Sequence, residues 1–261
     1  MSKNFELLQQ AEQAREAEVA LFAPEEEPRT AAPPVSIPFS EPSARVEARN
    51  PLLRTDEMSR EEIMKLVQRL FLLPGGVRRV VFAGVDPGTG CSWMTARVAD
   101  ILATQVSGSV CVVDANFRSG TLHSAFSVEN HFGFTDALSQ PGPVKQFASR
   151  LAPNLWLLSS GSMTSNGQAL LSSERLGARF AELRNEFDYI LIDTPALTVC
   201  ADPVAIAHFA DGIALVLEAD VTRRETARKS AQDLEAANIR VLGTILNKRS
   251  FPIPQSLYDR L

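Results

Sequence analysis

The stretch Val85-Asp86-Pro87-Gly88-Thr89-Gly90-Cys91-Ser92-Trp93 follows an apolar run and opens an amphipathic one. Its glycines permit a tight turn, and the helix expected to follow would direct its positive N-terminal end at the same spot. This arrangement is typical of a phosphate-binding loop, whose spacing is GxxxxGK[ST]. Gly90 and Ser92 keep their places in that spacing, whereas Val85 replaces the first glycine and Cys91 replaces the lysine.

Short apolar runs of strand type recur on both sides of this loop. They cover residues 79–85, 110–113, 155–158, 189–192, 213–217 and 241–246, and helical patterns separate most of them, notably 173–186 and 226–237. A further helix is expected from Ser59, whose spacing to Glu62 is that of a capping box, to the Pro74-Gly75-Gly76 stop. The alternation predicts an α/β fold, a mostly parallel β-sheet flanked by helices on both faces.

Polar motifs follow two of these runs at the point where each run ends. Asp114, Asn116 and Arg118 come after residues 110–113, and Asp193 comes after residues 189–192. In parallel sheets, ligands bind beyond the carboxyl ends of the strands. An acid after a buried strand is the usual holder of magnesium in phosphate-loop proteins. The three motifs therefore predict a single nucleotide site, for ATP or ADP with Mg²⁺.

The chain resembles the bacterial tyrosine kinases, cytoplasmic autokinases that govern capsule and exopolysaccharide synthesis and belong to the MinD/ParA-type P-loop NTPases. The resemblance spans about residues 58–250, and its blocks are VVFAGVDPGTGCS, VVDANFRSGTLHSAF, GFTDALS, LLSSERL, FDYILIDTPAL, ADGIALVLEAD and VLGTILNK. The wider ATPase class carries a signature lysine at the Asp86 position, which the kinases usually lack. The resemblance thus favours the kinase branch.

The resemblance implies roles for particular residues. Asp114, Asn116 and Arg118 match the catalytic positions, with Asn116 replacing the family's second acid. Ser92 and Asp193 match the magnesium positions. The implied nucleotide contacts are Pro87, Gly88, Thr89, Gly90, Cys91, Ser92, Trp93 and Asn247, the last at the expected adenine-contacting position.

Several family features are missing. Cys91 replaces the lysine that grips the β- and γ-phosphates, and the C-terminal tyrosine cluster is reduced to Tyr258. The E-x-x-R-x-x-R oligomerisation motif keeps its glutamate alone, as Glu62, Lys65 and Gln68. These losses predict a catalytically weakened regulator with residual ATP binding. The alternatives are an active tyrosine autokinase that modifies Tyr258 or a partner, and a MinD/ParA-like ATPase organiser.

Two residues of the loop have alternative interpretations. Cys91, at a helix N-terminus, is either a thiol of lowered pKa that responds to oxidants or a small uncharged filler. Trp93 stands where the family has a small residue, so it either crowds the phosphates or packs against the next strand.

Composition and patterning divide the chain into three parts. Residues 1–57 are expected to form an N-terminal docking helix, at Asn4–Phe22, and a Pro/Glu-rich disordered linker; seven of the 16 prolines lie between Pro24 and Pro51. Residues 58–251 form the nucleotide-binding-type domain, and residues 252–261 form a tail.

Charge and hydropathy limit the partners. The net charge of −5 does not favour nucleic acid, and no apolar run is long enough to span a bilayer. We expect a cytoplasmic protein that is recruited to the inner face of the membrane by a polysaccharide chain-length or export protein, or that binds an active kinase paralogue. Homo-oligomerisation is left open.

Overall fold

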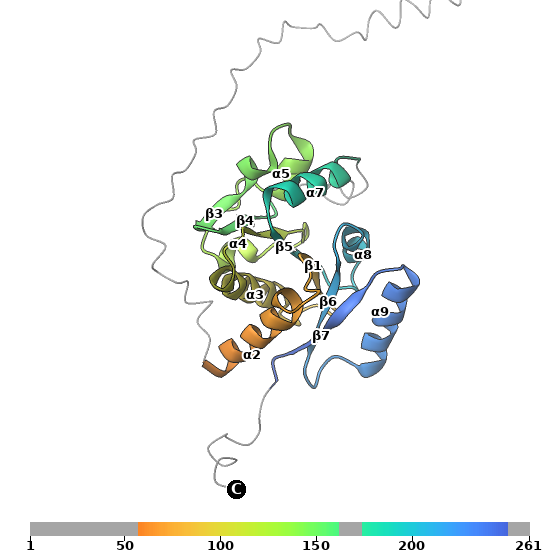
Figure 1. Cartoon of the computed structure of the whole chain (residues 1–261). Helices are drawn as coiled ribbons and strands as arrows, with labels where there is room; N and C mark the ends of the chain where they lie inside the picture. The colour runs from red at the N-terminus through yellow and green to blue at the C-terminus, as the bar shows by residue number, and fades with distance from the viewer. Residues whose placement is uncertain (1–56, 162–173, 250–261) are drawn as a thin grey trace, which may run out of the picture. The chain divides into compact units, whose positions relative to one another are not determined.

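The structure, a computed structural model, describes residues 57–161 and 174–249. Seven strands of this part form one sheet in the order β3-β4-β2-β5-β1-β6-β7 (Figure 1). The strands are β1 (Arg79–Gly84), β2 (Val110–Asp114), β3 (Ser149–Ala152), β4 (Leu155–Leu158), β5 (Tyr189–Thr194), β6 (Gly212–Glu218) and β7 (Val241–Asn247). All neighbouring strands are parallel except β3 and β4. The predicted α/β fold with a mostly parallel sheet is confirmed.

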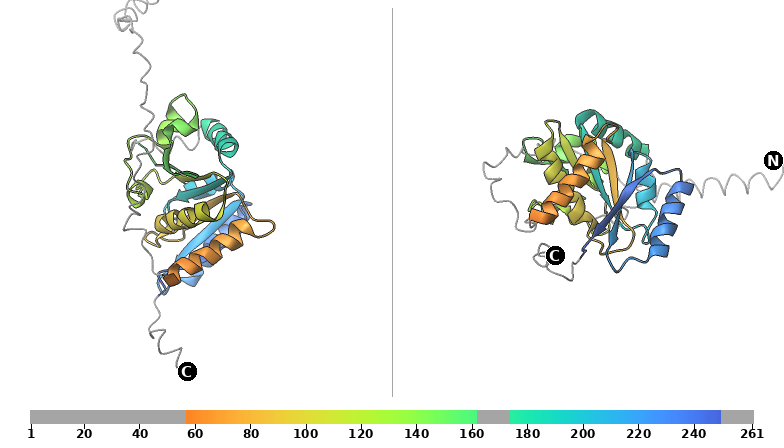
Figure 2. Two further views of the ribbon diagram at one scale, coloured as in Figure 1. Left: turned by 60° about the vertical axis from the view of Figure 1, so that its left-hand side comes forward. Right: turned by 60° about the horizontal axis from the view of Figure 1, so that its bottom comes forward.

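Helices cover both faces of this sheet (Figures 1 and 2). One face packs against α2 (Glu57–Val67), α3 (Cys91–Gln105) and α4 (Leu122–Ala125). The other packs against α5 (Phe134–Ser139), α7 (Glu174–Glu186), α8 (Asp202–Ala207) and α9 (Arg224–Ala236). Short helical turns η2 (Gln68–Leu72) and η3 (Val144–Phe147) complete the elements.

The central strands are apolar without interruption because both of their faces are covered. Val81 of β1 lies in the cluster beneath α7 and α8, and the next residue, Phe82, lies in the cluster beneath α2 and α3. Both side chains are fully buried. This alternation explains why the strands read as continuous apolar runs rather than as alternating ones.

Parallel pairing brings the polar strand ends to one edge of the sheet. Phe82 of β1 pairs in register with Asp193 of β5, and Asp193 pairs in register with Asp114 of β2. The chain leaves β1 at Gly84 at this edge and enters α3 at Cys91. The phosphate loop and the two acids are therefore placed together by the sheet itself.

Some local expectations differ from the structure. The first helix begins at Glu57, so Ser59 lies within it rather than at its N-cap, and the Glu62 carboxylate instead accepts a hydrogen bond from Lys65 Nζ at 2.7 Å. The helix widens into a π-turn at η2, where Leu73 N–H donates to the Gln68 carbonyl, as the buried Phe71 ring packs edge-on against Tyr189.

Other elements were absent from the expectation. The strand β3 is missing from it, as are the short helices α4, α5 and α8.

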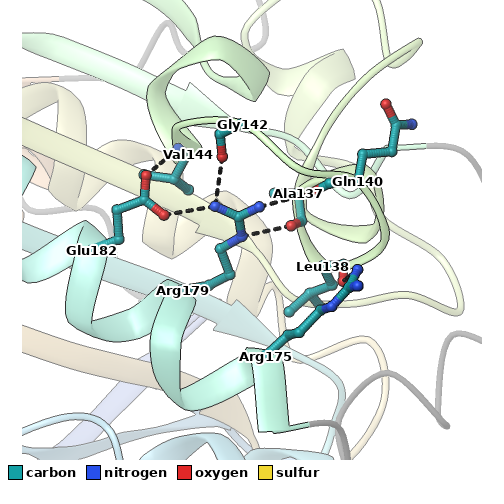
Figure 3. Close-up of polar contacts among 8 residues, drawn as sticks. All are labelled: Ala137, Leu138, Gln140, Gly142, Val144, Arg175, Arg179 and Glu182. Carbon is teal, nitrogen blue, oxygen red and sulfur yellow. Dashed lines mark hydrogen bonds and ion pairs between the residues drawn. The ribbon is translucent and has the colours of Figure 1, made fainter.

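The C-terminal end of α5 is held by two arginines of α7 (Figure 3). Arg179 donates hydrogen bonds to the carbonyls of Ala137, Gln140 and Gly142, at 2.6–2.7 Å, and pairs with Glu182. Arg175 donates to the carbonyl of Ser139 at 2.7 Å. Because the last carbonyls of a helix lack partners within it, these guanidinium groups supply donors to the end of α5 and to the turn that follows it.

Two of the predicted parts fall outside the described residues: the docking helix with its linker, and the C-terminal tail with Tyr258. Within residues 57–161 and 174–249, no helix has the length and apolar character that crossing a bilayer requires.

Candidate functional site

A cleft of about 530 Å³ opens at the carboxyl edge of the sheet, over the phosphate loop. Its wall contains the loop from Asp86 to Trp93, together with Asn116 and Arg118 from the segment after β2. The sequence had predicted residues 87–93, Asn116 and Arg118 as parts of one site, and the structure brings them together, with Asp86 in addition. The sequence analysis did not single out the other lining residues, which are Gly84, Ser119, Thr121, Thr194, Pro195, Ala196 and Val199.

The loop presents three backbone N–H groups for which the described part of the chain offers no acceptor. Among the described residues, nothing accepts a hydrogen bond from the N–H of Gly88, Thr89 or Gly90. Gly88 and Gly90 adopt φ of +83° and +81°, a conformation that favours glycine. All three residues line the cleft, so a bound anion can accept hydrogen bonds from this row of backbone donors, which is the chemistry of an anion cradle.

The segment after β5 fixes the start of the loop. Leu197 N–H donates to the carbonyl of Gly84 at 2.9 Å, and Thr198 Oγ1 donates to that of Val85 at 3.0 Å. A methyl group at Gly84 would lie 2.4 Å from Thr89 Oγ1, a hydroxyl that is buried and has no hydrogen-bond partner among the described residues. The glycine that this loop needs therefore stands one position before the motif's first glycine, which explains why Val85 is tolerated.

Cys91 directs its thiol into the interior beside Asp193. Burial, and then the negative charge of Asp193, hold the pKa of the thiol well above its ordinary value. The interpretation of Cys91 as a thiol of lowered pKa is therefore wrong, because desolvation and a neighbouring carboxylate outweigh the helix N-terminus. The thiol is a neutral group in the place where the motif carries an ammonium.

Asp114 and Asp193 form a buried pair of acids beneath the cleft. Burial and the charge of Asp193 raise the pKa of Asp114 to about 8. Burial also raises the pKa of Asp193, to about 6, although the side chains of Ser92, Cys91 and Thr95 oppose that rise. Asp114 accepts hydrogen bonds from the N–H groups of Asn116 and Leu122, whereas Asp193 Oδ2 has no partner among the described residues.

Asn116 and Arg118 line the cleft from the segment that follows β2. Asn116 Oδ1 accepts hydrogen bonds from the N–H groups of Arg118 and Ser119, at 3.3 and 3.2 Å, which closes a turn. The Arg118 guanidinium is partly exposed, and its Nε lies 3.9 Å from Oδ2 of Asp202 at the start of α8. Asn116 therefore shapes the turn that presents Arg118 to the cleft.

The end of β7 lies behind the loop. Asn247 Nδ2 donates to the carbonyl of Thr89 at 2.8 Å, and Lys248 Nζ donates to that of Gly88 at 2.6 Å. Neither residue lines the cleft. Asn247 thus lies against the loop, with its amide held by the loop backbone, and its adenine contact stays a prediction. The sequence analysis did not assign Lys248 to the site.

Trp93 lines the cleft, and its side chain packs against the hydrophobic cluster beneath α2 and α3. Packing against the core is therefore confirmed, and crowding of a bound phosphate stays a prediction.

The donor set fits a phosphate group with Mg²⁺. The free loop amides and the N-terminus of the long helix α3 suit the phosphates, and the unpartnered Asp193 Oδ2 with the Ser92 hydroxyl suits the ion. Mg²⁺ usually binds through one or two carboxylates and keeps its remaining ligands as water and phosphate oxygens. Accordingly, the described residues hold no cluster of three or more His, Cys, Asp or Glu that would bind a metal by itself. Bound there, the ion would supply neutralising charge to the phosphates.

A second cavity, of about 500 Å³, lies at the opposite edge of the sheet. Two of its three arginines have partners within the fold: Arg79 pairs with Asp211, and the Arg78 guanidinium lies 4.6 Å from the centre of the Tyr189 ring. It contains none of the predicted site residues.

Comparison with known proteins identifies relatives of the chain. The family model of the cellulose biosynthesis protein BcsQ matches residues 77–239. The tyrosine-protein kinase YwqD of Bacillus subtilis is 31% identical over 172 residues, which are 66% of this chain and 72% of that protein. The putative tyrosine-protein kinase EpsB of Ralstonia solanacearum is 30% identical over 173 residues, but the match spans 23% of its length.

Solved structures show the same fold. The kinase domain of the Escherichia coli tyrosine kinase ETK superposes with a TM-score of 0.68 at 21% identity, covering 79% of this chain and 84% of that one. The septum site-determining protein MinD of Pyrococcus horikoshii, complexed with Mg-ADP, gives 0.56 at 20% identity, covering 70% and 76%. The fold is therefore that of the MinD/ParA P-loop ATPases, and the match to YwqD shows that the chain belongs to the bacterial tyrosine-kinase family.

Proposed function

We propose that this protein is a catalytically weakened member of its family that regulates exopolysaccharide or capsule synthesis or export and retains nucleotide binding. The observation that carries the proposal is the charge of the cleft. Of the described residues that line it, Asp86 and Arg118 are the charged ones, and their charges cancel. The position that would hold the phosphate-gripping ammonium holds instead the neutral Cys91 thiol.

The consequence for catalysis follows from how phosphoryl transfer works. The protein contributes mainly positioning and stabilisation of charge on the transferred group. Loss of one such stabilising group costs about 3–4 kcal/mol, or roughly 10²–10³ in rate. Asn116, in place of an acid, accepts a hydrogen bond but takes up no proton. Together the two changes lower the rate by about 10⁴, although such effects are not additive.

Binding depends on groups that remain. The free N–H donors of the loop, the helix dipole of α3 and the Asp193 carboxylate do not require the lysine. We therefore expect Mg-ADP and Mg-ATP to bind, with dissociation constants about 10²-fold above those of a kinase with an intact loop.

The biological setting is inferred from the relatives. The resemblance to kinases of capsule and exopolysaccharide synthesis, and the match to a family named for cellulose biosynthesis, support a role in polysaccharide assembly. We propose a cytoplasmic protein that is recruited to the membrane by a polysaccharide chain-length or export protein, or that acts on an active kinase paralogue. The proposed contact is the segment Asn4–Phe22, whose apolar residues include Phe5, Leu7 and Leu8.

Catalysis is tested with the purified full chain, Mg²⁺ and radiolabelled ATP. We expect no phosphotyrosine and a turnover below about 1% of that of an intact family kinase assayed in parallel. The matched control is Asp193→Ala, which removes the buried carboxylate and reports any contaminating kinase. Phosphotyrosine on Tyr258, at a rate near that of the intact kinase and lost in Asp193→Ala, would support the active-autokinase alternative and contradict the proposal.

Recruitment is tested in the cells from which the gene comes. Leu7→Glu with Leu8→Glu should move the full-length protein out of the membrane fraction, because two charges would replace apolar contacts. The matched control is Gln9→Glu with Gln10→Glu, which adds the same charge at neighbouring polar positions. Equal loss from the membrane fraction in both pairs would point to a general charge effect rather than to a docking surface.

A further inference from the structure

Two consecutive residues at the end of β7 hold two consecutive carbonyls of the phosphate loop. Lys248 Nζ donates to the Gly88 carbonyl at 2.6 Å, and Asn247 Nδ2 donates to the Thr89 carbonyl at 2.8 Å. The contacts join positions that lie about 160 residues apart in the sequence. Of the lysines in the described residues, which are Lys65, Lys145, Lys229 and Lys248, the last is the one whose ammonium contacts the loop.

The carbonyls that are held belong to the peptide groups that face a phosphate. The Gly88 carbonyl shares its peptide group with the N–H of Thr89, and the Thr89 carbonyl shares its group with the N–H of Gly90. Neither N–H has an acceptor among the described residues. Each of the two groups therefore accepts a hydrogen bond at its oxygen and keeps its N–H free.

Such a peptide group is a stronger donor than an isolated one. A hydrogen bond to its oxygen polarises the group, and this effect of one bond on the next is strongest in a low-dielectric setting. Thr89 is buried, whereas Gly88 and the Lys248 side chain are exposed, so water screens the ammonium in part while the Thr89 half of the group lies away from water. A charged donor forms the stronger bond, so the ammonium of Lys248 should act on the Thr89 N–H more than the amide of Asn247 acts on the Gly90 N–H.

The backbone at Lys248 is built for this contact. Its φ is +56°, a left-handed conformation that is uncommon for residues other than glycine. The Glu218 carboxylate, at the end of β6, accepts a second hydrogen bond from the same Nζ at 3.1 Å. This carboxylate orients the ammonium and also neutralises part of its charge.

We propose that Lys248 is a positioning residue for nucleotide, which strengthens the phosphate cradle from behind the loop and partly replaces the lysine that is absent at position 91. It does so through the Gly88–Thr89 peptide group, without lining the cleft. The inference rests on the proposed function, since it assumes that the loop binds a phosphate.

Calorimetric titration of the full chain with Mg-ADP tests the effect on binding. Lys248→Met should weaken binding about threefold to tenfold, and Lys248→Arg should retain most of it. Glu218→Gln should tighten binding, because the ammonium would lose its neutralising partner. The matched control is Lys229→Met, which removes the same charge from an exposed position on α9. Equal weakening by Lys248→Met and Lys229→Met would overturn the inference, as would no weakening by Lys248→Met.

The amide proton shifts of the nucleotide-free protein give a readout that needs no ligand. In Lys248→Met the Thr89 amide proton should move upfield more than that of Gly90, and in Asn247→Ala the order should reverse. If the wild-type chain binds no nucleotide, the retention of binding under "Proposed function" is contradicted, and the Thr89 shift alone then decides the inference. A Thr89 amide shift that Lys248→Met leaves unchanged overturns it.

Discussion

Asp114 and Asp193 stand directly opposite each other in the register of the parallel strands β2 and β5, and both are fully buried. Burial disfavours both carboxylates, and each further disfavours the charge of the other. The folded protein therefore holds protons at these acids more tightly than the unfolded chain, in which an aspartate has a pKa of 3.8. When both acids are ionised, burial and mutual repulsion destabilise them, and a bound cation would reduce that cost.

The first prediction concerns the stability of the protein without metal. Because the folded-state pKa values are raised, the folded state binds more protons than the unfolded state between about pH 4 and pH 8. The stabilisation is fully present below this window and is lost as the pH rises through it. In chelator-containing buffer, urea unfolding should show the free energy of unfolding falling by up to about 1.4 kcal/mol per pH unit for each linked proton.

Asp193→Asn should flatten this dependence, because it removes one titrating group and the repulsion on the other. Asp220→Asn is the matched control: Asp220 is exposed, and its φ of +61° suits asparagine. A wild-type stability that rises between pH 5 and pH 8, or a profile that Asp193→Asn leaves as steep, would contradict the assignment of the raised pKa values to this pair.

The second prediction concerns the lost charge at position 91. Cys91→Lys places an ammonium in the motif's position beside Asp193 and should tighten Mg-ADP binding about 10²-fold, which calorimetry measures. Cys91→Ser is the matched control, because it keeps a small neutral side chain and should change the affinity little. Similar affinities in Cys91→Lys and Cys91→Ser would show that the cleft is impaired elsewhere, with Trp93 as the first place to look.

Recovery of ATP turnover should need the family's acid at position 116 as well as the lysine at position 91. Asn116→Asp keeps the acceptor oxygen for the N–H groups of Arg118 and Ser119, so the turn should survive the change. ADP release from Mg-ATP should be near background in each single variant and clearly above it in the combination of Cys91→Lys and Asn116→Asp, because one group supplies charge and the other proton uptake. If Cys91→Lys alone restores full turnover, the acid at position 116 is dispensable.

The sequence was informative where burial alone determines structure. Strands buried on both faces read as apolar runs, so six of the seven strands were predicted to within two residues. The strand β3 was not predicted, because it is a short edge strand of four residues that is largely exposed and so has no apolar run. The π-turn at η2 accompanies the packing of Phe71 on Tyr189, a contact between residues far apart in the sequence.

The residues of the site were predictable from the sequence, but their partners were not. Motif residues at strand ends came together because parallel pairing places every carboxyl end at one edge. The partners of those residues were not predictable, since no local pattern links Lys248 to Gly88 or Thr198 to Val85. The environment of Cys91 is also a property of the fold, because burial and the charge of Asp193, which lies on β5, raise the pKa of its thiol.

The third prediction concerns the clamp between α7 and α5. Arg179→Met leaves the carbonyls of Ala137, Gln140 and Gly142 without their donor; water can replace it at the exposed Gln140 and Gly142, so the free energy of unfolding should fall by about 1–3 kcal/mol. Arg179→Lys should lose less stability than Arg179→Met but more than none, because a single ammonium cannot make all the hydrogen bonds of a planar guanidinium. Arg184→Met, at an exposed position on the same helix, is the control for charge and helix propensity. Equal losses for Arg179→Met and Arg184→Met would contradict a specific clamp.

The fourth prediction isolates the contact that permits Val85 in the loop. A methyl group at Gly84 would lie 2.4 Å from Thr89 Oγ1, so Gly84→Ala must displace either the loop or the hydroxyl. We expect Gly84→Ala to lower the free energy of unfolding by about 1–3 kcal/mol and to weaken Mg-ADP binding. Thr89→Ala alone should cost less, because the buried Thr89 hydroxyl has no hydrogen-bond partner among the described residues and its removal leaves no donor or acceptor unpaired.

The double variant decides whether the contact itself is responsible. With the hydroxyl removed, the nearest remaining atoms to the new methyl group are the Asp86 carbonyl oxygen at 3.0 Å and the Thr89 Cβ at 3.6 Å, which require a smaller adjustment. Gly84→Ala with Thr89→Ala should therefore recover much of the stability that Gly84→Ala loses, giving a coupling free energy of about 1 kcal/mol in a double-mutant cycle. Additive losses would mean that Gly84 is required for its backbone freedom, and the displaced glycine would then not account for Val85.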